Sequence, residues 1–249
     1  MRRVDVLGVE VSAINMEMAL GSISGWIDAL DRQYVCVTGV HGVMESQRDP
    51  ALAAIHNASG LTTPDGMPMV WAGKKAGADW MERVYGPDLM LAVCQLAADA
   101  GWSSFFYGGS PGVPEQVAEA LRARFPALKI AGCYSPPFRA LTDEEKADVT
   151  DMINTASPTL VWVGLSTPKQ ERWMAEFRPL LEAPVLFGVG AAFDIHAGRL
   201  PQAPPWMQQS GLEWAYRLYR EPRRLWRRYL VNNPRFVAAI LSRPPRLVP

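Results

Sequence analysis

The sequence predicts an α/β protein with a mostly parallel sheet covered by helices on both faces, followed by a helical appendage. Short apolar runs typical of buried strands alternate with longer amphipathic runs as far as Phe193. Hydrophobic residues make up 49% of the 249 residues, which is enough for a large core and excludes a disordered chain. After Phe193 the alternation stops and Pro, Trp, Tyr and Arg become frequent. We therefore expect an α/β core over residues 1–200 and an appendage over residues 201–249.

The first sixty residues follow this alternation. Residues 4–11 (VDVLGVEV) are expected to form a strand or a hairpin. Asn15 is suited to cap a helix that runs to Leu30, because its side chain can accept a hydrogen bond from a free backbone N–H group. Residues 34–38 (YVCVT) read as a buried strand, and we expect one helix around residues 43–58.

Proline and glycine mark the boundaries of the elements that follow. Pro87 and Asp88 open a helix that ends at Gly101, because Pro favours the first turn and an acid complements the helix N-terminus. The other predicted elements are the strand 61–63 with its turn at 64–66, strand 103–109, helix 114–125, strand 129–135, helix 142–156, strand 159–166, helix 168–181 and strand 184–193.

The formal charge is zero, with 25 basic and 25 acidic residues, but the charges are unevenly distributed. Residues 1–205 carry a net charge of −7 and residues 206–249 a net charge of +7. The basic segment contains nine arginines, no lysine, and only Glu213 and Glu221 as acids. The neutral total therefore says nothing about charged partners, whereas its division near residue 205 does.

The cysteines predict a reduced, cytosolic chain without a structural metal. Cys36, Cys94 and Cys133 are widely spaced and form no CxxC pair, so neither a disulfide framework nor a zinc site is expected. The N-terminal residues contain no apolar run long enough for a signal peptide. The longest apolar stretch, residues 185–193, is too short to span a bilayer, so we expect no transmembrane segment.

An aspartate lies in a stiff turn directly after a predicted strand. Asp65 is followed by Gly66 and stands between Pro64 and Pro68, which would hold a general base in position; a plain Asp-Gly turn is the alternative. Further along, Arg83 lies in a loop just before a helix. It could clamp a phosphate or pair with a surface acid.

A glycine-rich loop follows the strand 103–109. Gly108, Gly109 and Gly112 would let backbone N–H groups approach a phosphate at the N-terminus of the next helix. A tight turn that needs glycine for positive φ angles explains the same residues. The chain contains no GxxxxGK[ST] motif, which argues against a P-loop ATPase or kinase.

Another strand leads into a possible donor-rich loop, GLSTPKQE. We expect Gly164 to end the strand, Thr167 to cap the next helix, and Pro168 to take its first position. Lys169 and Gln170 would then lie in the first turn, at the carboxyl edge of the sheet. They could bind a nucleotide or a sugar there, although ordinary helix capping accounts for the pattern as well.

The basic segment interleaves arginine with aromatic residues. Six arginines fall within residues 217–228, together with Tyr219 and Trp226. Three partners fit this pattern: a nucleic acid, an anionic membrane surface, or a diphosphate held by bidentate guanidinium groups. The absence of lysine favours the geometric recognition that arginine provides.

These segments, in this order, resemble the WecG/TagA/CpsF family of bacterial glycosyltransferases (glycosyltransferase family 26). The resemblance runs from about Tyr34 to Phe236. Its most specific stretches are VGLSTPKQERW at 163–173, VGVGAAFDIHAG at 188–198 and GLEWAYRLYREPRRLWRRYL at 211–230.

The resemblance implies an inverting glycosyltransferase with a Rossmann-like core. Such an enzyme moves a sugar from a UDP-sugar to a polyprenyl-diphosphate-linked saccharide during synthesis of a bacterial surface polysaccharide. It also implies a peripheral enzyme at the cytoplasmic face of the plasma membrane, with the appendage reaching an anionic membrane surface. The donor sugar, the acceptor saccharide and the oligomeric state stay open, and a homo-oligomer is compatible with the sequence.

The resemblance also assigns residues. It places the catalytic base at Asp65 and substrate-binding roles at Arg83 and Gln170. The phosphate-binding arginines of the appendage correspond to Arg217, Arg224 and Arg228, with Arg227 beside them. We add the loop residues named above as substrate-binding candidates: Gly108, Gly109 and Lys169.

Two stretches depart from the family pattern. A TxN-type segment is common after the second strand, whereas this chain has Thr38-Gly39-Val40-His41. We expect Thr38 and His41 to contact substrate, with His41 in place of the usual Asn. The family's RAP is Gln202-Ala203-Pro204 here, so one arginine is lost.

The chain has no D-x-D pair, the usual metal-binding motif of nucleotide-sugar transferases. We therefore expect a metal-independent reaction without a cofactor, in which arginines and helix N-termini stabilise the leaving diphosphate. Two other functions compete with this interpretation. A nucleic-acid-binding module would use the basic tail, but the acidic core argues against it. A nucleotide-dependent oxidoreductase would need a GxGxxG after the first strand, which is missing.

Overall fold

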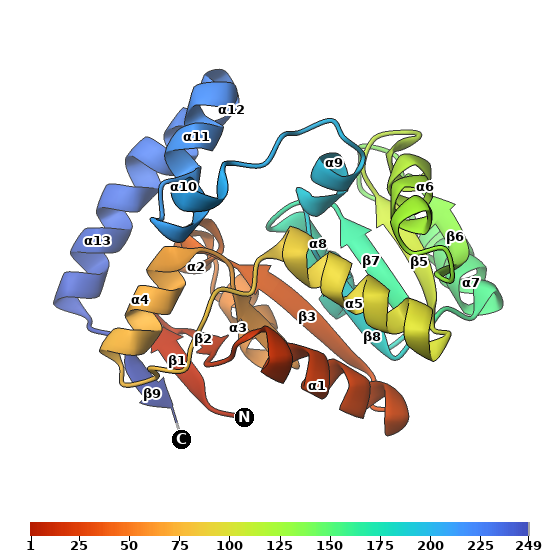
Figure 1. Ribbon diagram of the computed structural model, residues 1–249, viewed down its shortest axis with the longest axis horizontal. Coiled ribbons are helices and arrows are strands. Elements are labelled where there is room, and N and C mark those ends of the chain that lie inside the picture. Colours follow the sequence, from red (N-terminus) through yellow and green to blue (C-terminus); the bar gives the residue numbers. More distant parts are fainter. Residues whose placement is uncertain (249) are drawn as a thin grey trace. The chain divides into compact units, whose positions relative to one another are not determined.

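The structure, a computed structural model, describes residues 1–248, and the chain divides into two units (Figure 1). Unit 1 contains residues 1–19, 37–85 and those from 201 onwards. Unit 2 contains residues 20–36 and 86–200. The C-terminal segment thus groups with the N-terminal residues and with the segment that includes Asp65.

The main sheet is built from six strands in the order β4-β3-β8-β7-β5-β6. Their bounds are β3 Gln33–Thr38, β4 Leu61–Pro64, β5 Ser103–Gly108, β6 Lys129–Tyr134, β7 Leu160–Gly164 and β8 Val185–Gly188. The pairs β3–β8, β8–β7, β7–β5 and β5–β6 are all parallel. Strand β8 is buried along its whole length, as expected for a parallel sheet covered on both faces.

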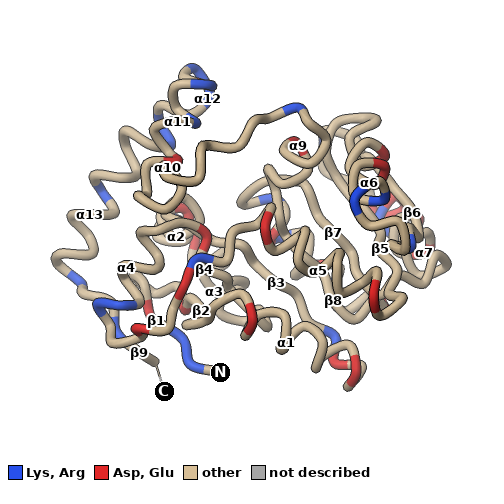
Figure 2. The backbone as a smooth tube through the Cα atoms, in the orientation of Figure 1, with Lys and Arg blue, Asp and Glu red and all other residues tan. Residues whose placement is uncertain are grey.

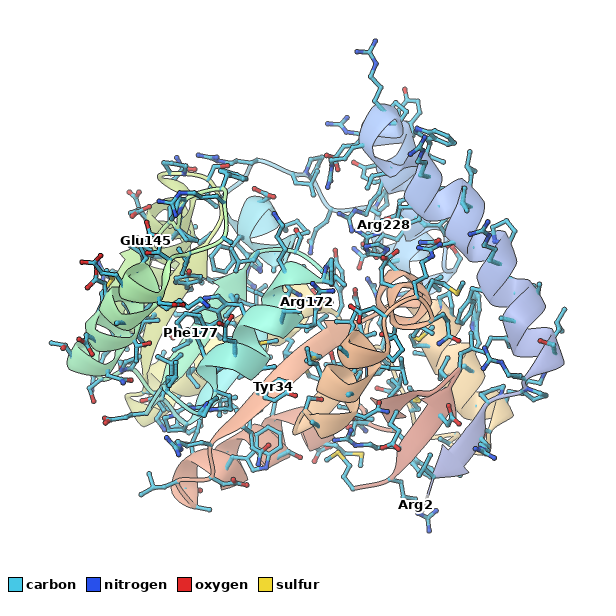
Figure 3. The ribbon with its side chains drawn as sticks, turned by 180° about the vertical axis from the view of Figure 1, so that it is seen from behind. Arg2, Tyr34, Glu145, Arg172, Phe177 and Arg228 are labelled. Carbon is cyan, nitrogen blue, oxygen red and sulfur yellow. The ribbon has the colours of Figure 1, made fainter. Side chains whose placement is uncertain are left out.

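Helices cover both faces of the sheet in unit 2, which confirms the predicted fold class. Helices α5, α6 and α9 lie on the face seen in Figure 1, and α7 and α8 lie on the face seen in Figure 3. Their bounds are α5 Gly86–Ala100, α6 Val113–Arg124, α7 Asp143–Ala156, α8 Lys169–Phe177 and α9 Ala192–His196. Helix α7 begins with a capping box in which Thr142 and Glu145 exchange hydrogen bonds with each other's backbone N–H group.

A small antiparallel sheet belongs to unit 1. The predicted hairpin is present as β1 Arg3–Val6 and β2 Val9–Ser12, and β9 Arg246–Val248 pairs with β1 on its other edge. Helix α1 Met16–Asp28 follows, and Asn15 caps it by accepting a hydrogen bond from the Met18 backbone N–H at 2.9 Å.

The single helix expected around residues 43–58 is wrong. The structure has two helices, α2 Val40–Ser46 and α3 Pro50–Ala58. Asp49 separates them, because its side chain accepts hydrogen bonds from Ala51 and Leu52 and so caps α3, while Pro50 takes the first helical turn. Helix α4, Met67–Lys75, then follows the turn at Asp65.

The C-terminal segment is helical, as predicted, and basic positions follow one another along it (Figure 2). It consists of α10 Pro205–Gln209, α11 Glu213–Arg220, α12 Pro222–Trp226, a π-helical turn over Arg227–Val231 and α13 Asn232–Ser242. Pro222 starts a new helix, as the sequence suggests. Among residues 1–248, no helix is both long and apolar enough to cross a membrane.

The core of unit 1 includes a side chain from this segment. Phe236 on α13 is 6% exposed and packs in one cluster with residues of the hairpin, α2 and α4, among them Val4, Val43 and Met69. Helix α13 is therefore part of the hydrophobic core of unit 1.

Candidate active site

Asp65 lies at the carboxyl end of β4, where the sequence predicts a rigid turn. All four residues of β4 are buried, and the Asp65 backbone N–H donates to the Thr38 carbonyl at the end of β3, at 3.0 Å. Gly66 has φ 107°, a conformation that favours glycine, and α4 begins directly after it. The two strand ends and the helix start thus fix the position of this carboxylate.

Gly39 allows the two strand ends to approach each other. A Cβ atom at this position would lie 2.5 Å from the Asp65 carbonyl oxygen, which is closer than real contacts permit. Gly39 lies in the segment that departs from the family pattern. The close approach of the two backbones explains why this position is glycine. Thr38 itself is buried, and its Oγ1 makes no hydrogen bond within the described residues.

Arg83 is held beside the Asp65 turn by backbone contacts. The Val84 N–H donates to the Pro64 carbonyl at 3.0 Å, and the Thr63 hydroxyl donates to the Val84 carbonyl at 3.3 Å. The Arg83 guanidinium lies over the Tyr85 ring, with 3.9 Å between its central carbon and the ring centre. These contacts explain why a loop residue 18 positions after Asp65 lies close to it.

Arg83 pairs with an acid, and its predicted contact with a phosphate stays a prediction. Its Nη2 donates to Glu213 Oε2 on α11, and its Nη1 donates to Gln208 Oε1 on α10 at 2.8 Å. The side chains of Arg83 and Glu213 are only 13% and 17% exposed, so this acid is not a surface residue.

Two arginines of the C-terminal segment lie near the carboxylate. Arg217 on α11 and Arg228 on the π-helical turn are both close enough to Asp65 to act on its pKa. Arg228 leaves the C-terminal helices on the side that faces α2 (Figure 3). The Nε atoms of Arg217 and Arg228 are buried without a hydrogen-bond partner within the described residues. Such groups are suited to an anionic ligand.

The electrostatics of this cluster favour a proton acceptor at Asp65. Desolvation and the negative charge of Glu213 raise its pKa from 3.8 to about 6, although Arg83, Arg217 and Arg228 oppose the rise. The group therefore stays ionised at neutral pH while being more basic than an ordinary aspartate.

The guanidinium groups respond to burial and to their neighbours. Burial lowers the pKa of Arg228 below its ordinary value. Burial also acts to lower the pKa of Arg217, but nearby groups, Tyr229, Tyr85, Glu213 and Asp65, raise it overall. Both arginines stay charged in the working range, because arginine is not deprotonated in proteins.

The structure does not bring every predicted arginine to Asp65. Arg224 on α12 forms a two-pronged contact with Glu221, at 2.8 and 2.5 Å, and its side chain is 57% exposed. Arg227 is exposed and lies over the Trp226 ring at 5.2 Å. His41 lies on α2 with its Nδ1 3.9 Å from Glu45 Oε1, and its predicted contact with substrate stays a prediction.

The other predicted residues lie in unit 2, at the carboxyl ends of β5 and β7. Gly108 has φ 122°, and a Cβ atom there would lie 2.8 Å from the Gly164 backbone. Gly109 has φ 73° and donates its N–H to the Gly164 carbonyl at 3.0 Å. The turn geometry alone requires glycine at both positions, and a phosphate contact stays a prediction.

The helix start at Gln170 differs in detail from the prediction. Thr167 does not cap α8, and Pro168 precedes the helix, which begins at Lys169. Instead, the Thr167 hydroxyl donates to Glu171 Oε1 at 2.8 Å. Ser166, directly before Thr167, adopts a left-handed conformation with φ 63°.

Gln170 and Lys169 differ sharply in burial. Gln170 is 2% exposed, and its Nε2 donates to the Gly188 carbonyl at 3.0 Å and to Glu171 Oε1 at 3.2 Å. These two bonds fix the orientation of the amide, so its Oε1 is the acceptor left for another group. Lys169 is exposed.

Sequence reasoning missed three residues of the cluster: Glu213, Gln208 and Tyr85. The first two lie more than 120 positions from Arg83, so no local spacing connects them. One signal was available, because Glu213 is one of only two acids in an otherwise basic segment. An acid among so many arginines can form an ion pair with one of them.

Comparison with known proteins gives the same family as the sequence motifs. The family model described as "Glycosyl transferase WecG/TagA/CpsF family" matches residues 4–247. A protein of Bacillus spizizenii named N-acetylglucosaminyldiphosphoundecaprenol N-acetyl-beta-D-mannosaminyltransferase is 32% identical over 198 residues, covering 80% of this chain and 74% of the relative. A Bacillus subtilis protein of the same name is 29% identical over 238 residues, covering 92% of this chain and 90% of the relative.

Proposed function

The chain belongs to the glycosyl transferase WecG/TagA/CpsF family and is a glycosyltransferase, and from this premise we propose its reaction. It moves a sugar from a UDP-sugar to a polyprenyl-diphosphate-linked saccharide, with inversion at the anomeric carbon and without a metal ion. The names of the two relatives make N-acetylmannosamine the first donor sugar to test and a diphosphate-linked N-acetylglucosamine the first acceptor.

The single observation that supports this reaction best is the carboxylate–arginine cluster around Asp65. A hydroxyl of the acceptor attacks the anomeric carbon, the bond from that carbon to the diphosphate oxygen breaks, and UDP leaves with the electron pair. Asp65 accepts the hydroxyl proton, for which its pKa of about 6 is well matched. One displacement inverts the anomeric centre, so no second nucleophilic carboxylate is needed.

Arg217 and Arg228 have the chemistry to stabilise the diphosphate. Negative charge develops on the leaving group, and buried guanidinium groups with unpartnered N–H donors stabilise such charge without reorganisation. Fixed arginines can thus replace the divalent cation that D-x-D enzymes use. We expect Gly108, Gly109, Lys169 and Gln170 to contact the nucleotide-sugar, and Thr38 and His41 to contact substrate near the carboxyl end of β3.

The apolar side chains of the C-terminal helices support attachment to a membrane surface. Several are strongly exposed and stand among arginines: Tyr219 at 82%, Trp226 at 46%, Leu230 at 56%, Val237 at 56% and Leu241 at 69%. Aromatic and aliphatic side chains flanked by arginine suit the interface of an anionic bilayer. We propose that this segment, Arg224 and Arg227 included, docks the enzyme on the cytoplasmic face of the plasma membrane, where its lipid-linked acceptor lies.

A donor panel tests the proposal. The purified full chain is incubated with UDP-N-acetylmannosamine, UDP-N-acetylmannosaminuronic acid, UDP-glucose and UDP-glucuronic acid, each with a short-chain polyprenyl-diphosphate N-acetylglucosamine, with and without EDTA. We expect one donor to give a disaccharide product whose rate is unchanged by EDTA. A strict Mn²⁺ requirement would contradict the arginine-based mechanism, and no product with any donor would contradict the proposed donor and acceptor classes.

Thermal shift separates this proposal from its two rivals. A ligand that binds only the folded chain raises its melting temperature. We expect UDP to stabilise the protein, and neither NAD nor duplex DNA to do so. Family membership already favours the transferase over both alternatives.

A further inference from the structure

Glu213 is a carboxylate on the basic C-terminal segment that is enclosed by the groups around Asp65. It lies at the first position of α11, and its side chain is 17% exposed. Its Oε2 pairs with Arg83 Nη2, and the Tyr85 hydroxyl forms a hydrogen bond with the same carboxylate. A carboxylate this far removed from water needs such partners, because unpaired buried charge is costly.

Arg83 is held on three sides by these contacts. Glu213 and Gln208 each take one of its Nη groups, and Tyr85 stacks under the guanidinium plane. The Arg83 Nε has no hydrogen-bond partner within the described residues, so one N–H donor of the guanidinium is left for a phosphate. This arrangement ties α10 and α11 to the loop that follows α4.

Glu213 and Arg217 lie four positions apart on α11, one turn along the same face. A contact that fixes Glu213 therefore fixes the direction in which Arg217 points. Arg217 is among the groups that act on the pKa of Asp65, so this face of α11 is the one turned toward the carboxylate.

We propose that Glu213 is a positioning residue that fastens α11 to Arg83 and Tyr85, and thereby holds Arg217 beside Asp65. The role assigned to Glu213 rests on the proposed function, in which Asp65 accepts a proton and Arg217 stabilises a diphosphate. Arg83 then acts through Glu213 as an anchor for α11. Glu213 itself touches neither substrate.

The electrostatic consequence can be measured at Asp65. The charged groups that face its carboxyl are Glu213 and Arg217 from α11, Arg83 from the loop after α4, and Arg228 from the π-helical turn. Glu213 raises the pKa of Asp65, and the three arginines lower it. Removal of the Glu213 charge leaves desolvation as the one cause that still raises this pKa, against three arginines that lower it, so the pKa of Asp65 falls.

The test compares Glu213→Gln with the matched control Glu176→Gln. Glu176 also pairs with a basic residue, Lys146, at 2.7 Å, but it is 50% exposed and belongs to α8. Two quantities are measured on the full chain: hydrogen–deuterium exchange of residues 213–220, and the titration of the Asp65 carboxyl by 13C NMR. The transfer reaction is followed over the same pH range.

We expect Glu213→Gln to speed exchange over residues 213–220 by about tenfold or more, because breaking a largely buried ion pair is strongly destabilising. The Asp65 titration and the acidic limb of kcat/KM should still move together to lower pH, because Glu213 acts on this pKa more strongly than the displaced Arg217 does. The displacement of Arg217 should lower kcat. Glu176→Gln should change none of these. If Glu213→Gln does not fold, Glu213→Asp replaces it, because the shorter side chain keeps the charge but withdraws from Arg83. In Glu213→Asp, exchange over residues 213–220 should rise, while the Asp65 titration should move less than in Glu213→Gln.

The proposal would be overturned if Glu213→Gln showed the same hydrogen exchange and the same Asp65 titration as Glu176→Gln, even if the wild-type protein is active in transfer. Absence of transfer in the wild type would instead count against the proposed function. The exchange and NMR measurements need no turnover. They therefore test whether Glu213 holds α11 and sets the Asp65 pKa even if the wild type shows no transfer.

Discussion

At the scale of single residues, the proposed role of Asp65 as the base makes the reaction depend on the pKa of its carboxyl. Desolvation and Glu213 raise that pKa to about 6. Only the ionised carboxylate is a base, so kcat/KM should fall about tenfold per pH unit below this value and level off above it. A pH profile of the transfer reaction checks this expectation, and a rate that stays constant well below pH 6 would contradict it.

The same shift links Asp65 to stability. Its native pKa of about 6 exceeds the ordinary value of 3.8, so between these values the folded chain binds more protons than the unfolded chain. Stability is therefore lost as pH rises through this window, and the loss persists at neutral pH. We expect Asp65→Asn to melt at a higher temperature than the wild type at neutral pH, and to lose this advantage at acidic pH. Thermal unfolding at both pH values measures the difference; an advantage of equal size at both would show that charge is not its cause.

The sequence identifies individual residues of the candidate site, but it does not show which of them pair with each other. Asp65 is a candidate because a stiff Asp-Gly turn is a local pattern, and the run of arginines is another such pattern. Within that run, the family resemblance singles out Arg217 and Arg228. The partner of Arg83 is not predictable in this way, since Glu213 lies 130 positions away and only the folded chain brings the two together. The exposure of Arg224 and Arg227 is equally hidden, because neighbouring arginines on a helix point in different directions.

At the scale of elements, the junction of β3 and β4 depends on Gly39. A methyl group there would lie 2.5 Å from the Asp65 carbonyl oxygen, so Gly39→Ala should push the Asp65 turn away from the arginines. We expect transfer to fall by about a hundredfold, since a displacement of about 1 Å can cost that much. The transfer assay measures the effect.

Gly25→Ala is the matched control for that substitution. Gly25 lies inside α1, with open space where its Cβ would be. Alanine should leave transfer unchanged and stabilise the chain by about 0.5–1 kcal/mol, because glycine disfavours a helix interior. Equal activity of the two variants would show that the close approach at Gly39 is unimportant for catalysis.

Element boundaries are predictable where a capping residue marks them. Asn15, Pro87 and Pro222 each mark a helix start in the sequence and in the structure. The prediction is wrong at Asp49-Pro50, where Asp49 caps a second helix, and at Thr167, which follows a left-handed Ser166 and bonds to Glu171 instead of capping the helix. A backbone angle set by tertiary packing leaves no local pattern to read.

At the scale of the whole molecule, the C-terminal segment contributes to the core of unit 1 as well as to the site. Phe236 packs in the same cluster as the hairpin and α4, and β9 adds a strand to β1. Phe236→Ala should therefore lower the free energy of unfolding by about 3 kcal/mol, the usual cost of emptying such a position. Val237→Ala, at a side chain that is 56% exposed, should change it little.

Denaturant unfolding of the two variants checks this prediction. Similar midpoints for Phe236→Ala and Val237→Ala would contradict the packing of α13 against the core. The sequence indicates a composition change near residue 205, but it does not show that the basic tail returns to pack with the first 19 residues. That contact joins the two ends of the chain, which local patterns do not connect.

The most direct test of Asp65 as the base compares the transfer rates of Asp65→Asn, the wild type and the control Asp99→Asn. Asp99 is an exposed aspartate that accepts hydrogen bonds from Gln95. Each protein is assayed in EDTA with the UDP-sugar that the panel selects and the polyprenyl-diphosphate-linked acceptor. We predict a product of inverted anomeric configuration from the wild type and from Asp99→Asn, and a rate lowered by about a hundredfold to ten-thousandfold for Asp65→Asn, with UDP binding retained. Near-wild-type turnover by Asp65→Asn would contradict the role of Asp65 as the base.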